Sequence, residues 1–106
     1  MILNIAQILN RDSAILTRDA LVCKKECLKH KKEKEIVLDL EGLEHAVSAW
    51  FNVLIYELAM EKMLEKVKFI NLKEEIWQYK IDQATKLATD KNYRKFYKKI
   101  VNEMFT

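Results

Sequence analysis

The sequence predicts a small α/β domain in which helices pack against a mostly parallel sheet. Two short apolar segments, at residues 35–40 and 66–72, are typical of strands. Several longer segments repeat their apolar residues every three to four positions, as amphipathic helices do. Because the expected strands alternate with helices, right-handed crossovers would place the helices against a parallel sheet. A length of 106 residues predicts a single domain over 1–106.

The first half of the chain contains one ambiguous segment followed by a helix and a strand. Residues 2–9 fit either a strand followed by a turn or a helix. Thr17 is a good N-cap for a helix that runs to about residue 30 and buries Ala20, Cys23 and Cys27. The strand at 35–40 follows, and Gly42, the only glycine in a chain without proline, comes directly after it.

The second half contains a helix, a strand and two further helices. A helix begins near Ser48, another good N-cap, and buries apolar residues at helical spacing, namely Phe51, Leu54, Ile55 and Leu58. After the strand at 66–72, residues 74–88 form a helix whose stripe passes through Ile76, Tyr79 or Lys80, Gln83 or Ala84, and Leu87. Residues 91–106 form a basic amphipathic C-terminal helix with one apolar stripe, consisting of Tyr93, Phe96, Tyr97, Ile100, Val101 and Met104.

Composition and charge exclude several classes of protein. Half of the residues are hydrophobic, which is too many for a disordered chain. No apolar run approaches the roughly 18 residues of a membrane span, and the N-terminus lacks the features of a signal peptide, so we expect a cytoplasmic protein. The net charge of +3 arises from 91–106, which hold five basic residues and one acidic residue. Residues 1–90 are nearly neutral, unlike a dedicated nucleic-acid-binding domain.

The segment from Asp39 to Ser48, with the sequence Asp-Leu-Glu-Gly-Leu-Glu-His-Ala-Val-Ser, resembles the strand–loop–helix signature of STAS domains. Asp39, Gly42 and Ser48 stand at the family's positions without a gap. The closer similarity is to the short bacterial STAS-like group, and three further matches extend it over roughly residues 15–72: Thr17–Ala20, Trp50–Asn52 and Val67–Asn71. The resemblance implies a small STAS-like sandwich and a non-catalytic regulatory domain that binds another protein reversibly.

The resemblance also implies the class of partner and a contact surface. Partners would include a histidine-kinase-like ATPase that acts as a serine kinase, or an anti-sigma-type regulator. The surface would be loop 41–49 with the first turns of the next helix, and its residues are Gly42, His45, Ser48, Trp50 and Asn52. Trp50 would anchor this interface if it is exposed.

Ser48 has two interpretations. A phosphate on a serine at a helix start would be stabilised by the free backbone N–H groups there, so Ser48 could be a phosphorylation switch. The simpler interpretation is an N-cap that contributes about 1 kcal/mol. The sequence departs from the family's usual switch at the flanking positions, where it has Val47, Ala49 and Trp50.

The sequence shows no enzyme signature and no complete metal site. Cys23, Cys27 and His30 share a helical face, but zinc needs a fourth ligand, so buried free cysteines are the better interpretation. His45 lies in the loop before the Ser48 helix, with no nucleophile at a recognisable spacing. We expect no catalytic residue, no cofactor and no metal.

Two alternatives to the regulatory role remain. The basic residues of the last helix could contact nucleic acid, and they are Lys91, Arg94, Lys95, Lys98 and Lys99. The separation of lysines from the apolar stripe favours instead a helix docked on its own domain or on a partner, so nucleic acid is the weaker alternative. The second alternative is a homo-oligomeric structural subunit, such as a homodimer, which would need an apolar patch.

Overall fold

The computed structural model describes residues 1–93, 95 and 99 and contains two parallel sheets and several helices. In chain order the elements are β1 (Ile2–Asn4), α1 (Ile5–Leu9), β2 (Ser13–Ala14), α2 (Thr17–Leu28), β3 (Ile36–Asp39), β4 (His45–Ala46), α3 (Ser48–Met60), a 3-10 helix (Leu64–Lys66), β5 (Val67–Ile70) and α4 (Glu75–Thr89). The strands expected at 35–40 and 66–72 and the helices expected near 17–30, 48–58 and 74–88 are confirmed. The α/β class with parallel strands is confirmed as well.

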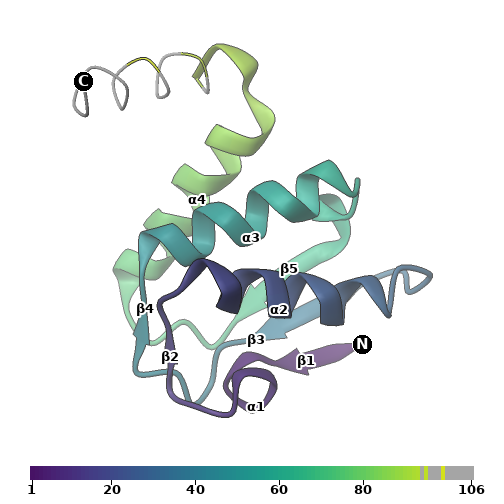
Figure 1. The fold of residues 1–106 in the computed structure, drawn as a ribbon, viewed down its shortest axis with the longest axis vertical. Coiled ribbons are helices and arrows are strands. Elements are labelled where there is room, and N and C mark those ends of the chain that lie inside the picture. The colour runs from purple at the N-terminus through teal and green to yellow at the C-terminus, as the bar shows by residue number, and fades with distance from the viewer. Residues whose placement is uncertain (94, 96–98, 100–106) are drawn as a thin grey trace.

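The larger sheet has the strand order β1-β3-β5, and both neighbouring pairs are parallel. Leu38 in the central strand pairs with Leu3 on one side and with Phe69 on the other. Figure 1 shows α2, α3 and α4 gathered on one side of this sheet. Because side chains alternate along a strand, these three residues point to the same face, and Leu38 is fully buried while Ile2 and Ile70 on the opposite face are exposed.

The second sheet, β2 with β4, does not follow from the sequence pattern. It contains only two residue pairs, with Ser13 beside His45 and Ala14 beside Ala46. His45 therefore lies in a short strand, and its predicted loop position is wrong. Strands of two residues are too short to show an alternating pattern, so only the tertiary pairing reveals them.

Residues 2–9 combine both expected alternatives, because β1 passes directly into α1. Asn4 makes the junction: its side-chain oxygen accepts a hydrogen bond from the backbone N–H of Gln7 at 2.9 Å, as an N-cap does. Asn10 ends the helix in the left-handed conformation, with φ 55°.

The predicted capping roles of Thr17 and Ser48 are wrong. Helix α2 begins at Thr17, but it is the Asp19 carboxylate that accepts hydrogen bonds, from the backbone N–H groups of Leu16 at 2.9 Å and Ile15 at 3.2 Å. Helix α3 begins at Ser48 itself, and no side-chain bond caps its start. A carboxylate in the first turn of a helix accepts from the N–H groups at and before the helix start, as in a capping box, whereas an N-cap hydroxyl would accept from an N–H group inside the first turn.

The buried core lies between the larger sheet and helices α2, α3 and α4. Helix α3 contributes the expected residues Phe51, Leu54, Ile55 and Leu58. Of the stripe predicted for α4, only Ala84 is buried: the other inward residues are Trp77, Ile81 and Ala88, whereas Ile76 and Tyr79 are exposed. The helix has apolar residues on two faces, so its periodicity alone could not identify the buried one.

After α4 the chain turns at Asp90, whose side chain accepts a hydrogen bond from the backbone N–H of Tyr93 at 3.0 Å. Residues 91–93, 95 and 99 are helical, which agrees with the expected helix at these positions. The remainder of the predicted helix at 91–106, including Arg94 and Lys98, lies outside the described residues.

Candidate functional site

The predicted contact loop runs along the carboxyl-terminal edge of the larger sheet, where ligands commonly bind in open α/β folds. Along this loop, from Leu40 to Ala46, buried residues are separated by two exposed residues. Leu40, Leu43 and Ala46 are buried, while Gly42 and His45 between them are exposed. The loop is therefore anchored in the core and presents its polar positions to the outside.

Polar side chains from the ends of all three strands hold this loop. The Asp39 carboxylate accepts hydrogen bonds from the Asn71 side-chain amide at 2.8 Å and from the backbone N–H of Glu41 at 3.0 Å. The Asn4 amide donates to the Glu41 carbonyl at 3.0 Å. Burial tends to raise the pKa of Asp39, but the hydrogen bonds from Asn71, Glu41 and Asn4 outweigh it and hold that pKa below its ordinary value. The charged carboxylate is the form that orders the loop.

Gly42 occupies a position that no other residue fits well. Its φ is +94°, in the region that L side chains rarely adopt, and an added Cβ would lie 3.2 Å from the Cβ of Ala6. A small hollow of about 210 Å³ beside it is lined by Glu44, Asn71 and Lys73 among others. Lys73 and Glu44 form an ion pair, so the charges on this side of the loop neutralise each other.

Ser48 and Asn52 lie one turn apart at the start of α3 and line a common hollow of about 260 Å³. The opposite wall comes from α4 and includes Ile76, Tyr79 and Lys80. The Lys80 ammonium donates to the carbonyl of Ala46 at 3.0 Å, two residues before Ser48. The structure therefore brings Ser48 and Asn52 together on one surface and leaves Ser48 exposed.

Trp50 is a core residue, and its predicted place on the contact surface is wrong. It is fully buried and packs edge-to-face on Phe51, with ring centroids 4.9 Å apart. Burial raises the pKa of the nearby Cys23 thiol and the indole N–H offsets part of that rise, but Nε1 has no hydrogen-bond partner among the described residues. The predicted surface consequently reduces to Gly42, His45, Ser48 and Asn52.

The exposed side of α4 is a surface feature that the sequence pattern did not identify. Ile76 and Tyr79 are 51% and 62% exposed, respectively, and they border the hollow beside Ser48. Tyr93 lines the same hollow, and its hydroxyl lies 2.7 Å from the side-chain oxygen of Gln83. The signal is present in the sequence as the stripe through Ile76, Tyr79, Gln83 and Leu87, but periodicity alone assigns that stripe to the core.

The two cysteines are buried, free thiols. Burial raises the pKa of Cys23 to about 12 and that of Cys27 to about 11. A thiol with so high a pKa is a poor nucleophile and metal ligand at neutral pH. Within the described residues, no group of three or more His, Cys, Asp or Glu side chains is arranged to hold a metal ion.

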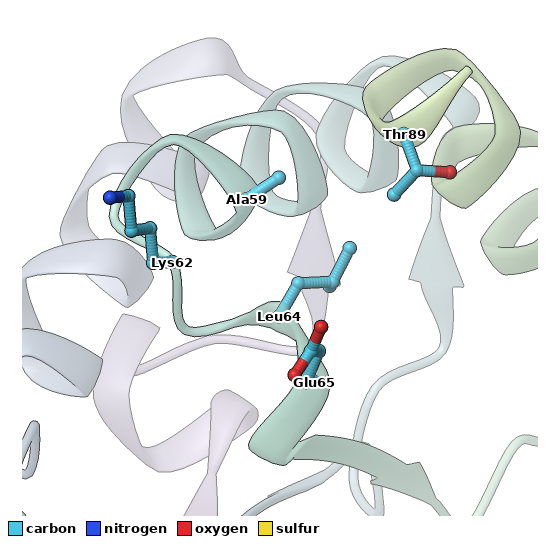
Figure 2. Close-up of a pocket in the computed structure, with 5 residues that line it drawn as sticks. All are labelled: Ala59, Lys62, Leu64, Glu65 and Thr89. Atoms are coloured by element: carbon cyan, nitrogen blue, oxygen red, sulfur yellow. The ribbon is translucent and has the colours of Figure 1, made fainter.

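A further hollow of about 430 Å³ lies where the C-terminal ends of α3 and α4 meet the 3-10 helix. Figure 2 shows Ala59 and Leu64 facing the same space, with Lys62, Glu65 and Thr89 around it. The Thr89 hydroxyl donates to the carbonyl of Thr85 at 2.7 Å and is already engaged. This lining offers aliphatic groups and one charge of each sign, which is not an arrangement for acid–base chemistry.

Among the described residues, no helix combines the length and the apolar character that crossing a membrane would need. This finding concerns residues 1–93, 95 and 99 only.

The comparisons with known proteins agree with the geometry at the family level. A family model described as a STAS-like domain of unknown function (DUF4325) matches residues 23–77, just over half of the chain. The matched range begins inside α2 and ends at the start of α4, so it includes the central strand, the anchored loop and Ser48. Searches of curated proteins and of solved structures found no match.

Proposed function

The chain belongs to the family of STAS-like domains of unknown function, and we propose that it is a non-catalytic regulatory domain that works by binding another protein reversibly. The observation that carries this proposal is the anchored loop. Gly42, His45 and Ser48 are exposed, while neighbouring residues hold the backbone through buried side chains and the hydrogen bonds of Asp39. A polar surface that is already ordered before binding loses little conformational entropy when a partner binds.

Two features support the first turns of α3 as part of the same surface. Ser48 and Asn52 face one hollow, and the exposed side chains of Ile76 and Tyr79 border it. Protein interfaces commonly combine aromatic and aliphatic contacts with a polar rim. For the partner, the STAS-like resemblance favours a histidine-kinase-like ATPase or an anti-sigma-type regulator.

A phosphorylation switch at Ser48 is the finer part of the proposal. The hydroxyl is exposed at the first residue of α3, where a phosphate would meet the free N–H groups of the helix start. The Lys80 ammonium lines the same hollow and could exchange its bond to the Ala46 carbonyl for one to the phosphate. The added negative charge would alter the surface that the partner contacts.

The experiment that tests the binding role places a photo-crosslinking amino acid in the full chain at His45 or at Asn52. Lys25, exposed on α2 away from the loop, provides the matched control position. We expect the same protein, identified by mass spectrometry, to crosslink from positions 45 and 52 and not from position 25. Equal crosslinking from all three positions, or none from position 45, would contradict the proposal.

The switch requires a separate measurement. The full chain is incubated with ATP and the ATPase recovered by crosslinking, and phosphopeptides are then mapped. Phosphate on Ser48, together with loss of the crosslink in Ser48→Asp but not in Ser48→Ala, would support the switch. If Ser48 stays unmodified while other serines or threonines are phosphorylated, the switch is wrong and the binding role stands.

Nucleic-acid binding is the second candidate. Lys91, Lys95 and Lys99 are exposed and helical, and residues that follow one another at four-residue intervals in a helix lie on one face. Binding of mixed-sequence DNA or RNA whose affinity falls steeply with salt, and which is lost when these three lysines become glutamines, would favour this candidate over the regulatory role.

A further inference from the structure

The side of α4 turned away from the core carries Ile76, Tyr79 and Leu87 together with one polar residue, Gln83, whose side-chain oxygen accepts a hydrogen bond from the Tyr93 hydroxyl. Ile76, Tyr79, Gln83 and Leu87 follow one another at intervals of three to four residues and line one hollow. The neighbouring stripe of α4, which contains Trp77 and Ile81, is the one that packs into the core. An exposed isoleucine and an exposed tyrosine on the same turn give this face an apolar contact surface that a partner helix could bury.

Charges at the two ends of α4 are complementary to each other. Glu75 lies in the first turn and Lys86 in the last, and both are exposed. Neither residue forms an ion pair within the described part of the chain. Their separation of eleven residues corresponds to about 16 Å along the helix, too far for them to pair within one copy.

We propose that the outer face of α4 is a dimer interface, in which a second copy of this chain packs its own α4 antiparallel across a two-fold axis. A two-fold interface uses the same patch on both copies, so a helix with an acidic start and a basic end can satisfy both charges at once. Glu75 of each copy then faces Lys86 of the other. The self-complementary charge pattern is what identifies a second copy, rather than another protein, as the occupant.

The apolar residues fit the same register. In an antiparallel pair, each step forward along one helix is matched by a step back along the other. When Glu75 faces Lys86 of the second copy, Ile76 therefore lies near Leu87 and Tyr79 near Gln83. The axis passes between residues 80 and 82, close to the middle of the described stripe. One register therefore brings Ile76 onto Leu87 and pairs the charges of Glu75 and Lys86 at the same time.

This inference goes beyond the proposed function and does not depend on it, because it rests on the charges and apolar residues of α4 and not on segment 41–46, although Ile76 and Tyr79 border both surfaces. The two surfaces meet at the hollow that Ser48 and Asn52 share with Tyr79. A second copy on α4 would partly cover that hollow, so dimer formation and partner binding through Ser48 would compete.

The test is a charge exchange measured by sedimentation equilibrium on the full chain. The variants are Glu75→Lys, Lys86→Glu and the double variant, with Lys25→Glu as a control for a lysine exposed on another helix. We expect wild type to rise with concentration from 12.6 kDa toward twice that mass. Each single variant should weaken the dimer about tenfold, because each faces two like-charged contacts, and the double variant should restore it to within about threefold.

Mixing the two single variants gives an independent readout. In a dimer that contains one Glu75→Lys copy and one Lys86→Glu copy, both symmetric contacts between positions 75 and 86 join opposite charges. The mixture should therefore associate more strongly than either variant alone. Circular dichroism of each variant establishes that the chain is folded.

Three outcomes would overturn the proposal. Wild type could stay monomeric up to about 1 mM, a concentration at which even a weak complex is populated. The double variant and the mixture could both fail to recover association. The third outcome is that Glu75 and Lys86 serve only the dipole of α4, in which case the double variant would be the least stable and would show no recovered dimer.

Discussion

The side-chain amide of Asn71, just after β5, donates a 2.8 Å hydrogen bond to the carboxylate of Asp39 at the end of β3. Asn71 makes this contact from the left-handed region, with φ 57°. The bond connects two neighbouring strand ends, and the same carboxylate also orders the contact loop through Glu41.

Replacing Asn71 should therefore destabilise the domain through two separable effects. Asn71→Ala loses the hydrogen bond and also puts alanine at a positive φ, which alanine adopts less readily than asparagine. We therefore expect a loss of about 2 kcal/mol in the free energy of unfolding. Asn71→Gly loses only the bond and should cost about 1 kcal/mol. Urea denaturation measures both, and equal losses would contradict the conformational part.

Gly42 should tolerate no side chain. Gly42→Ala combines the unfavourable φ of +94° with a Cβ 3.2 Å from the Cβ of Ala6, and we expect a loss of about 1 to 2 kcal/mol. The double variant Gly42→Ala/Ala6→Gly relieves the contact but not the φ. If the two positions clash, the double variant should be more stable than the sum of the two single effects predicts. A double variant that is less stable than that sum would argue against a clash.

Asp19 should make stability depend on pH in the acid range. Burial tends to raise its pKa, but the N–H groups of Leu16 and Ile15 and the guanidinium of Arg11 hold it below the ordinary value of 3.8. A carboxyl group whose pKa is lowered on folding stabilises the protein above its unfolded pKa, and that stabilisation disappears as the pH falls through the folded pKa.

Asp19→Asn should accordingly be less stable than wild type at pH 7, by about 2 kcal/mol, because Arg11 loses its charged partner. The difference should shrink as the pH falls below about 3.8. Urea denaturation at pH 7, 4 and 3 measures it, with the exposed Asp82→Asn as the control. A difference that stays constant over this range would show that the charge of Asp19 is not the cause.

The two thiols should react only when the protein unfolds. Cys23 and Cys27 are fully buried, and their pKa values are about 12 and 11. At pH 8 we expect labelling by a disulfide reagent to be slow in buffer and complete within minutes in concentrated urea. Rapid labelling of the folded protein would show that α2 opens easily.

The strand at 35–40, the helices and the family resemblance could be predicted because each depends on residues close together in the chain. Asp39, Gly42 and Ser48 stand at fixed spacings, and the family match over 23–77 includes all three. The anchored loop could not be predicted, because Asn4 and Asn71 reach it from strands more than thirty residues away.

Trp50 and helix α4 show what only the tertiary structure decided. The sequence determined that α4 has apolar residues on two faces and that an aromatic residue stands near the start of α3. Phe51 lies against both Trp50 and Trp77, with ring centroids 4.9 and 6.4 Å away, so these large side chains share one core and leave Ile76 and Tyr79 outside. The periodicity of a sequence indicates which faces of a helix are apolar. Which of these faces is buried depends on the space that the neighbouring elements leave for its side chains.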